Sequence, residues 1–551
     1  MITEDLAVLV REALERARAD GAIDIERLPE PTFERPKRRE HGDWSSNVAL
    51  VAGKSGGGPR SIAQAIVDRL SASPLIESVE IAGPGFLNFK LSPQWLADVV
   101  RRAADPEGRF GMKPPDSGVR MNVEYVSANP TGPVNVVSGR HAAMGDAISN
   151  LLEAAGHDVS REFYINDAGR QVELFAESLS VRYLQQLGRH ANLPEDAYHG
   201  DYLIELARDI VSEVGEKYID VSPEERREAM RELGLERMVT EMRASLERFG
   251  TSFDVWFSEH SLHTSGEIDA VIDRLRRDGW MFARDAALWF QSSRLGDDKD
   301  RVVVRANGDT TYLASDLAYL IDKFSRGFDH LIYLWGADHH GSIARLKAGA
   351  RALGFDEGTV EIAIVQIVTL LRGGETVKAS KRAGILVPLD ELVNEVGIDA
   401  ARYTFLSRSM ESPLDFDIEL AKEQAPENPV YYVQYAHARI CSILRRAEER
   451  GARAGFDAVL ESLTHPSEDE LMRKLAAYEE VVPEAAALRA PQRIARYIEE
   501  LAAVFTAFYR DCRVVSDDAE LTQGRLALCL ATKGVIASGL GLLGVTAPES
   551  M

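Results

Sequence analysis

Residues 119–167 read VRMNVEYVSANPTGPVNVVSGRHAAMGDAISNLLEAAGHDVSREFYIND, and this stretch decides how the chain folds. Its first eight residues predict a strand, and the turn-forming loop SANPTGP follows them. A helix is predicted from about Asn135 to Ala155, and Gly156 stands in the position that glycine favours after a helix. Residues 158–167 then alternate as a second strand. The order strand, helix, strand predicts a βαβ unit, the building block of a parallel sheet.

The same alternation returns after about residue 298. The segments in order are the strand RVVVR at 301–305, the helix SDLAYLIDKF at 315–324, the strand DHLIYLWGAD at 329–338, the helix SIARLKAGARAL at 342–353 and the strand VEIAIVQIVTLL at 360–371. Between about 178 and 298 the pattern is mainly helical and heavily charged. We therefore predict that residues 113–390 form a Rossmann-like parallel-sheet domain of the nucleotide-binding type, interrupted by a helical insertion at about 178–298.

Two further domains are predicted at the ends of this α/β chain. Residues 2–19 form an amphipathic helix pattern, and a second helix is expected over Ser61–Leu70 with Ser61 as its N-cap. Residues 78–92 predict two strands joined by the turn Gly83-Pro84-Gly85. These elements indicate a small α+β domain over residues 1–112. After about Pro388 the pattern is almost entirely helical, so residues 391–551 are expected to form an all-α bundle.

Composition excludes several classes of protein. The 551 residues are 45% hydrophobic and 27% charged, as in soluble globular proteins, so the chain is neither disordered nor fibrous. With 64 basic and 87 acidic residues the net charge is -23, which argues against a protein that coats nucleic acid non-specifically. The cysteines, Cys441, Cys512 and Cys529, form no CxxC pair, so neither a disulfide framework nor a zinc site is expected. The first twenty residues lack the apolar core of a signal peptide, and the longest apolar stretch, 534–547, is shorter than a membrane span. We expect a cytoplasmic protein without a membrane partner.

Two loops carry residues suited to bind phosphate. The loop SANPTGP precedes a helix, whose first N–H groups and positive dipole end attract anions, although Asn-Pro and Gly-Pro also form ordinary turns. Residues 375–384, ETVKASKRAG, combine three cations with a serine after a glycine turn. Such a segment can clamp a pyrophosphate, or it can be a solvated charged loop.

Two other segments offer polar groups to a different part of a ligand. WGADHHG at 335–341 ends a predicted strand, and its side chains suit a polar floor for an amine or a ribose better than a metal site, because no further ligands stand at zinc-like spacing. Tyr312 and Asp316 share one helical face at i,i+4. A phenol beside a carboxylate can bind a planar cation, or the carboxylate can simply stabilise the helix N-terminus.

Taken together, these motifs resemble one family. SANPTGP, YINDAGRQ, TYLASD, WGADHHG and KASKRAG occur in this order, and the combination is similar to the arginyl-tRNA synthetase family of class I synthetases. EHGDWSSNVAL at 40–50 resembles that family's N-terminal tRNA-binding domain, and NPVYYVQYAHARI at 428–440 resembles the start of its helical anticodon-binding domain. The resemblance implies an ATP-dependent ligase that joins L-arginine to its tRNA through an arginyl-adenylate, with Mg²⁺ accompanying ATP, no zinc, and a monomeric state.

The resemblance also assigns roles to individual residues. The catalytic group is Lys378, Ser380, Lys381, Asn135 and Ser138. ATP is expected to contact Pro130, Gly132, Asn135, Ser138, Gly139, Gly336, Asp338, His340, Lys378 and Lys381. Arginine is expected to contact Glu124, Ser127, Asn129, Tyr312, Asp316 and His339. Candidates for tRNA contacts are Arg38, Arg39, Tyr435, Arg439, Tyr509 and Arg510, although the tyrosines could instead be core residues of the bundle.

One motif departs from the family's pattern. Asn135-Val136-Val137-Ser138 stands where the family usually has His-x-Gly-His, so an amide and a hydroxyl replace two imidazoles as hydrogen-bond donors. Lys378-Ala379-Ser380-Lys381 keeps both lysines of the usual Lys-Met-Ser-Lys motif. A non-catalytic RNA-binding relative that retains the fold is the alternative hypothesis; the altered helix motif favours it, and the retained lysines oppose it.

Overall fold

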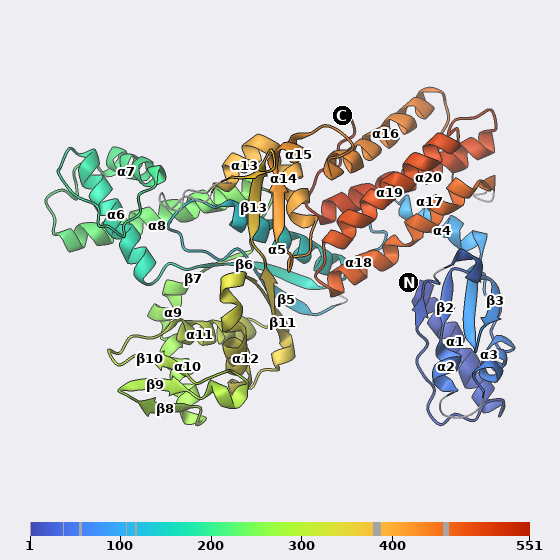
Figure 1. The fold of residues 1–551 in the computed structure, drawn as a ribbon, viewed down its shortest axis with the longest axis horizontal. Helices are drawn as coiled ribbons and strands as arrows, with labels where there is room; N and C mark the ends of the chain where they lie inside the picture. Colours follow the sequence, from blue (N-terminus) through green and yellow to red (C-terminus); the bar gives the residue numbers. More distant parts are fainter. Residues whose placement is uncertain are drawn as a thin grey trace.

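The computed structural model describes residues 2–36, 38–53, 58–105, 107–115, 118–377, 387–455 and 462–551. The molecule is elongated and has four parts: the N-terminal domain, the central sheet with its helices, a helical insertion and the C-terminal bundle (Figure 1). The N-terminal domain lies at one end, beneath the helical C-terminal bundle. The central sheet occupies the middle, and the helices α6, α7 and α8 extend from it at the opposite end.

The central sheet is parallel throughout and has the order β12-β11-β5-β6-β7. Its strands are β5 (Arg120–Glu124), β6 (Asp158–Ile165), β7 (Val255–Ser258), β11 (His330–Gly336) and β12 (Val360–Val365). The chain runs from β5 outward to β6 and β7, then returns to place β11 on the other side of β5. The strand order therefore reverses at β5, and parallel sheets bind ligands at the carboxyl edge beside such a reversal.

Helix α5 (Val136–Ala154) connects β5 to β6, so the predicted βαβ unit is confirmed. Asn135 is its N-cap, with the side-chain oxygen accepting from the backbone N–H of Ser138 at 3.0 Å. Gly156 follows the helix with φ +90°, a left-handed conformation that glycine adopts without strain. Further along the chain, α11 (Tyr312–Ser325), the 3₁₀ turn η3 (Ala337–Ser342) and α12 (Ile343–Ala352) flank β11.

The predicted helical insertion contains more strand than the sequence indicated. Its elements in order are α6 (Arg170–Gln186), α7 (Asp201–Val214), α8 (Pro223–Arg248), β7, α9 (Glu259–Ser265), α10 (Glu267–Arg277), β8 (Met281–Arg284), β9 (Ala287–Phe290) and the 3₁₀ turn η2 (Ser292–Leu295). Strand β7 belongs to the central sheet. Strand β10 (Arg301–Val304), expected in that sheet, pairs instead with β9 in the antiparallel sheet β10-β9-β8, where only Val303 of its four residues is buried. A strand with one buried residue does not suit a sheet covered on both faces.

The N-terminal domain is a four-stranded antiparallel sheet packed against helices. Its elements are α1 (Ile2–Ala19), β1 (Phe33–Glu34), η1 (Arg39–His41), β2 (Trp44–Ser46), α2 (Val48–Ala52), α3 (Pro59–Val67), β3 (Ile76–Ala82), β4 (Phe86–Leu91) and α4 (Pro93–Ala103), with the strand order β1-β2-β4-β3. The predicted hairpin at Gly83–Gly85 is confirmed. The predicted N-cap at Ser61 is wrong, because α3 begins at Pro59, which favours the first helical position, after Gly58 as N-cap.

The chain after β12 is helical apart from one small sheet. The predicted single strand over 360–371 is divided: β12 stays in the central sheet, and β13 (Val368–Arg372) pairs with β14 (Glu375–Thr376) and β15 (Leu414–Asp417). The helices are α13 (Leu389–Val396), α14 (Ile398–Leu406), α15 (Ile418–Lys422), α16 (Pro429–Glu449), α17 (Pro466–Ala476), α18 (Tyr478–Ala487), α19 (Gln492–Asp511) and α20 (Ala519–Leu542). Among the described helices, α20 is long and apolar enough to cross a membrane, with a mean hydropathy of 1.4 over an 18-residue window. However, 61% of that window is buried within the protein.

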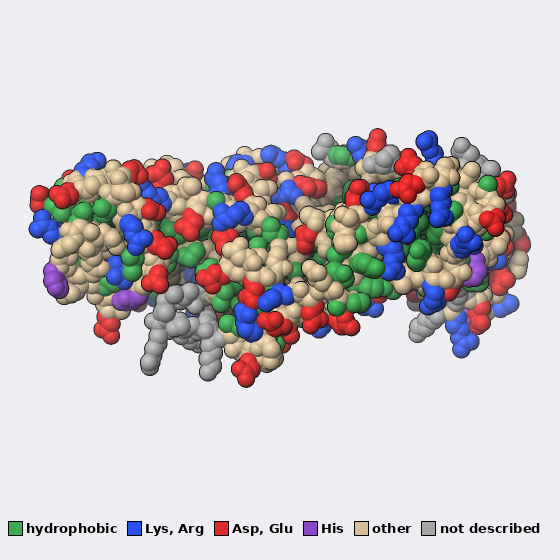
Figure 2. Space-filling view, turned by 90° about the horizontal axis from the view of Figure 1, so that it is seen from above, with side chains coloured by type: hydrophobic (Ala, Val, Ile, Leu, Met, Phe, Trp, Pro, Cys, Tyr) green, Lys and Arg blue, Asp and Glu red, His purple; other side chains and the backbone are tan. Residues whose placement is uncertain are grey.

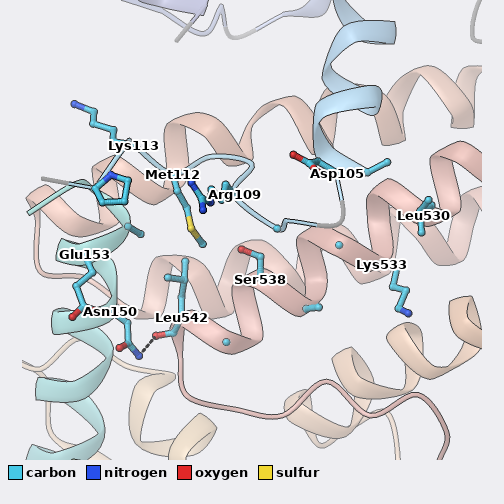
Figure 3. Close-up of a pocket in the computed structure, with 17 residues that line it drawn as sticks. Asp105, Arg109, Met112, Lys113, Asn150, Glu153, Leu530, Lys533, Ser538 and Leu542 are labelled. Carbon is cyan, nitrogen blue, oxygen red and sulfur yellow. Dashed lines mark hydrogen bonds between the residues drawn. The ribbon is translucent and has the colours of Figure 1, made fainter. Parts of the chain in front are cut away.

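A cavity of about 990 Å³ lies where three parts of the chain meet. Its walls come from the connector after α4, the C-terminal half of α5 and one face of α20 (Figure 3). The α20 face includes four small residues, Gly534, Ala537, Ser538 and Gly541, between larger ones. This part of the contact between α5 and α20 is therefore hollow.

The two glycines of this α20 face form a matched pair for mutagenesis. A Cβ on Gly541 would meet nothing within 4 Å, whereas a Cβ on Gly534 would stand 2.8 Å from the carbonyl oxygen of Ala103. We predict that Gly541→Ala stabilises the protein by about 0.5–1 kcal/mol, because alanine loses less backbone entropy in a helix. Gly534→Ala is expected to destabilise it by about 1–3 kcal/mol through overpacking. Urea unfolding of both variants measures the difference, and equal effects would contradict it.

Candidate active site

A cavity of about 600 Å³ opens at the carboxyl edge of the central sheet, beside β5 and β11. The sequence-predicted residues in its wall are Glu124, Ser127, Asn129, Ser138, Tyr312, Asp316, Gly336, Asp338 and His339. They come from the ends of β5 and β11 and from the first turns of α5 and α11. The reversal of strand order at β5 thus brings together loops that lie far apart in the sequence.

Other predicted residues do not line this cavity: Pro130, Gly132, Asn135, Gly139 and His340. Gly139 faces α13, where an added Cβ would stand 2.5 Å from Leu389. The side-chain oxygen of Asn135 is engaged in capping α5. Lys378, Ser380 and Lys381 lie outside the described residues, so their position relative to the cavity is not given.

The backbone is strained where β5 enters the cavity. Val126 and Ser127 have φ values of +69° and +34°, which is unusual for residues other than glycine and most unusual for a β-branched one. The bend turns the Ser127 hydroxyl back toward the strand. There it donates to Glu124 Oε1 at 3.0 Å and accepts from the backbone N–H of Tyr164 at 3.2 Å. Strain of this kind costs about 1–3 kcal/mol per residue and is common at functional sites.

Buried ion pairs fix α11 across the sheet beneath the cavity. Lys323 is fully buried, and its Nζ donates to Glu124 Oε2 at 2.6 Å. One turn further along α11, Arg326 donates to both carboxylate oxygens of Glu162 on β6, each at 2.8 Å. Since Lys323 already neutralises Glu124, the charge that this carboxylate was expected to offer a ligand is largely compensated within the protein.

Two other carboxyl groups face the cavity without an ion-pair partner of this kind. Burial raises the pKa of Asp316 to about 7, with Arg345 opposing the shift and Glu124 adding to it. Burial also raises the pKa of Glu259 to about 7, and the nearby Asp316 and Asp167 add to that shift. Glu259 Oε2 is buried and lacks a hydrogen-bond partner in the described structure. Acids that line one cavity without a Lys or Arg ion pair suit a ligand cation that supplies the missing charge and donors.

Glu259 was not among the predicted site residues, because its segment was assigned to a helical insertion. Glu259 follows β7 directly, and β7 ends at the same edge of the sheet as β5 and β11. The run VWFS before it, at 255–258, has the composition of a strand, but its four residues are too few to identify one. His141 in α5 was also missed; it lines the cavity, and burial lowers its pKa to about 4, so the imidazole is neutral.

A second cavity of about 600 Å³ adjoins the first, and Glu259 and Tyr312 line both. Its wall mixes charges of both signs. The cations are Arg170 at the start of α6, Arg231 on α8 and Arg305 after β10; the acids include Glu173 and Glu228. The Tyr312 side chain at the boundary between the two cavities is 58% exposed.

On the helical bundle, three of the predicted RNA-contact residues come together. Arg439 on α16 lies over the rings of Tyr435 and Tyr509, at 4.6 and 5.6 Å from the ring centroids. Both tyrosines are about 40% exposed, so they are surface residues and not part of the bundle core. Figure 2 shows several Lys and Arg side chains gathered over this end of the molecule.

The remaining predicted RNA contacts are dispersed. Arg510 follows Tyr509 but is bonded to Asp511, with Nε 2.8 Å from the carboxylate. Arg38 is exposed and pairs with Glu40 at 3.4 Å, and Arg39 begins the turn η1. The structure therefore places Arg38 and Arg39 in the N-terminal domain, apart from the ring cluster of Tyr435, Arg439 and Tyr509, whereas Arg510 stands beside Tyr509 on α19 and is bonded to Asp511.

Comparisons with known proteins cover the whole chain. The family model "Arginyl tRNA synthetase N terminal domain" matches residues 4–91, "tRNA synthetases class I (R), catalytic domain" matches residues 113–415, and "DALR anticodon binding domain" matches residues 433–551. The arginine–tRNA ligase of Moorella thermoacetica is 47% identical over 550 residues, 99% of this chain and 98% of that protein. That of Heliobacterium modesticaldum is 45% identical, over 100% of this chain and 99% of that protein. The Thermus thermophilus arginyl-tRNA synthetase structure shares the fold, with a TM-score of 0.79 at 24% identity over 100% of both chains.

The raised pKa values of Asp316 and Glu259 predict how arginine binding depends on pH. A guanidinium stays charged throughout the neutral range and binds the ionised carboxylates, so each group that titrates near pH 7 must lose its proton first. The dissociation constant of arginine is therefore expected to fall by about tenfold per carboxyl as the pH rises from 6 to 8. Isothermal titration calorimetry over this range, in two buffers, measures both the affinity and the protons released. Proton uptake on binding would contradict the prediction.

Proposed function

Because the chain belongs to the arginyl-tRNA synthetase family of class I aminoacyl-tRNA synthetases, we propose that the cavity at the carboxyl edge of its central sheet is where arginine is activated. The enzyme ligates L-arginine to tRNA through an arginyl-adenylate, with ATP as the second substrate. The observation that carries the placement is the pair of carboxyl groups, Asp316 half-buried and Glu259 buried, that line this cavity without a Lys or Arg ion pair among the described residues, at the edge where a class I synthetase binds its small substrates.

In the proposed complex the guanidinium of arginine lies between Asp316 and Glu259, with the Tyr312 hydroxyl beside it. Two carboxylates meet the planar fork of a guanidinium through paired hydrogen bonds, which the point charge of lysine cannot reproduce. Glu124 belongs to the same wall but is neutralised by Lys323, so its proposed role is to orient Ser127 and complete the floor. Asn129 and His339, which line the same cavity, are proposed to hold the α-amino group.

ATP is proposed to lie along the start of α5. The Ser138 hydroxyl and the backbone N–H of Val137 are proposed to face phosphate oxygens there, because the N–H groups of Val136 and Ser138 are already bonded, to the Val387 carbonyl and to the Asn135 side chain. Asn135 retains its side-chain NH₂ for the same purpose while its oxygen caps the helix. Gly336 and Asp338 at the end of β11 are proposed to contact the ribose. The family pattern alone supports the proposed ATP contacts of Pro130, Gly132, Gly139 and His340.

The phosphate clamp is proposed from the sequence. Lys378 and Lys381, with Ser380, would neutralise charge that develops on the leaving pyrophosphate, which is where an electrostatic contribution lowers a barrier. Mg²⁺ is proposed to enter with ATP. Among the described residues no three metal-binding side chains converge, which fits an ion held mainly by the phosphates and water.

The reaction requires no protein nucleophile. The arginine carboxylate attacks the α-phosphorus of ATP and pyrophosphate leaves; then a hydroxyl of the terminal adenosine of tRNA attacks the activated carbonyl and AMP leaves. The protein contributes position and charge, by holding the two reactants together at one sheet edge. The mixed-charge cavity beyond Tyr312 is proposed to receive the 3′ end of tRNA, because Arg170, Arg231 and Arg305 can meet its phosphates.

At the other end of the tRNA, the ring cluster of Tyr435, Arg439 and Tyr509 is proposed to stack with anticodon bases. Arg38, Arg39 and Arg510 are proposed to contact phosphates. The domain limits 1–112, 113–390 and 391–551, a monomeric state, a cytoplasmic location and the absence of a membrane partner remain proposals. The alternative of a non-catalytic RNA-binding relative has no support from the relatives, which are ligases by name.

Asp316→Asn tests the arginine site. Removing the charge is predicted to raise KM for arginine by about 100-fold, because the ligand cation is left without a buried partner, while KM for ATP changes little. Preference for arginine over the neutral analogue citrulline should fall in parallel. The measurement is arginine-dependent ATP–pyrophosphate exchange in the presence of tRNA.

Asp322→Asn on the same helix is the matched control, since Asp322 pairs with Arg326 at 2.9 Å and does not line the cavity. It is expected to leave KM for arginine within about threefold of the unmodified enzyme. Unchanged arginine kinetics in Asp316→Asn would remove the assignment, and exchange that never depends on arginine would remove the proposed function itself.

A further inference from the structure

Arg402 occupies an unusual position between three parts of the chain. It lies on α14, its side chain is fully buried, and each of its three guanidinium nitrogens donates to a protein acceptor. Nη1 donates to the carbonyl oxygens of Phe249 and Gly250, at 3.1 Å each, and Nε donates to that of Leu543 at 3.2 Å. Nη2 donates to the carboxylate of Asp146.

These acceptors belong to different parts of the molecule. Asp146 is on α5, whose first turn lines the active-site cavity through Val137 and Ser138. Phe249 directly follows α8, the long helix that leads back from the insertion, and Leu543 directly follows α20, the last helix of the bundle. The C-terminal ends of two helices thus point their free carbonyls at one guanidinium, an arrangement that favours a cation.

The contact tolerates little displacement. A Cβ on Gly544 would stand 2.1 Å from Arg402 Nη2, so the chain after α20 passes directly against the guanidinium. Among the described contacts, Asp146 is the only acid that pairs with Arg402. Separating a buried guanidinium from its acceptors is strongly unfavourable, so α20, α14 and α5 are expected to move together.

A second bond joins α5 to the same end of α20. Asn150, one turn after Asp146, donates from Nδ2 to the carbonyl oxygen of Leu542 at 3.3 Å (Figure 3). Beside this bond lies the cavity of about 990 Å³ between α5, α20 and the connector. Because apolar packing is incomplete there, the polar bonds at the end of α20 carry much of the connection between the two helices.

On its other side α14 is bonded to the helices that hold the ring cluster. The Tyr403 hydroxyl contacts the Ala495 carbonyl and Glu499 on α19, the helix of Tyr509. Asp399 accepts from Gln434, the residue before Tyr435 on α16, at 2.7 Å. Hydrogen bonds therefore connect α14 on one side to the helices of the proposed anticodon surface, and on the other side to α5, whose first turn lines the active-site cavity.

We propose that Arg402 is a positioning residue that transmits the position of the anticodon-bound bundle to α5, so that the correct tRNA increases the rate of arginine transfer. The inference rests on the proposed function, because it takes the ring cluster as the anticodon surface and the start of α5 as part of the ATP site. Arg402 itself touches no substrate; it acts through Asp146 and the end of α20.

The test uses the full-length enzyme and two transcripts: an arginine tRNA, and the same tRNA with its anticodon bases replaced. For each transcript, aminoacylation gives kcat, and filter binding gives the dissociation constant. In the unmodified enzyme the replaced anticodon is expected to lower kcat as well as affinity. In Arg402→Lys, which keeps the charge but not the fork of donors, the kcat ratio between the two transcripts is expected to shrink by about 2- to 30-fold. The ratio of dissociation constants should stay the same, since the anticodon surface is untouched.

Arg226→Lys is the matched control. Arg226 is also a buried arginine that donates to carbonyls, those of Tyr218 and Ile219, but it lies within the insertion and away from α14. It is expected to lower the melting temperature without changing the kcat ratio. Tyr403→Phe removes the hydroxyl contacts from α14 to Ala495 and Glu499 on α19 and keeps the ring. It should shrink the kcat ratio in the same direction by a smaller factor, and it provides the test if Arg402→Lys does not fold.

Two results would overturn the inference while arginine charging persists. One is an Arg402→Lys enzyme that is slower on both transcripts by the same factor, with Tyr403→Phe unchanged. The other is an unmodified enzyme whose kcat does not depend on the anticodon. Failure of the unmodified enzyme to charge any tRNA with arginine would instead contradict the proposed function, and with it the inference.

Discussion

The buried ion pair between Lys323 and Glu124 is the contact on which the arrangement of the active site depends. It joins the last turn of α11 to the end of β5, and the Lys323 ammonium also lies over the rings of Tyr319 and Tyr333, at 4.4 and 4.0 Å. Breaking such a pair costs about 3–5 kcal/mol, because the remaining charge stays buried without a partner. With Lys323 held there, the N-terminal turn of the same helix stands at the carboxyl edge of the sheet and presents Asp316 to the cavity.

The pair also divides the acids of the site into two groups. Glu124 and Glu162 are compensated by Lys323 and Arg326, so they organise the floor. Asp316 and Glu259 are not compensated in this way, and burial holds both pKa values near 7. A cationic substrate supplies the charge that the second group lacks, and a neutral substrate of the same shape does not. The strained bend at Val126 and Ser127 is maintained because Ser127 bonds both to Glu124 and to the backbone of Tyr164.

The domains are connected by contacts of unequal strength. The N-terminal domain meets the bundle through apolar packing of α4 on α17 and α20 and through ion pairs, some of them partly exposed, such as Arg35 with Glu480 and Arg102 with Glu479. Pairs of this kind contribute about 0–1 kcal/mol each and weaken in salt. The bundle meets the catalytic domain through the fully buried Arg402, each of whose guanidinium nitrogens donates to a protein acceptor. The bundle is therefore linked directly to a helix that lines the active site.

The sequence by itself determined the βαβ unit, the three-part domain order and the family, because these depend on local periodicity, turn residues and motifs that can be identified without a structure. It also placed Tyr312 and Asp316 on one helical face. It could not reveal that Glu259 joins them, since the strand before it, VWFS, is too short to be distinguished from the charged helices around it. Only the tertiary structure decided that Glu124 is neutralised, because its partner Lys323 stands 199 positions away. Such a pairing depends on which strands become neighbours in the sheet, and that order arises from burying all five strands at once, which no local pattern encodes.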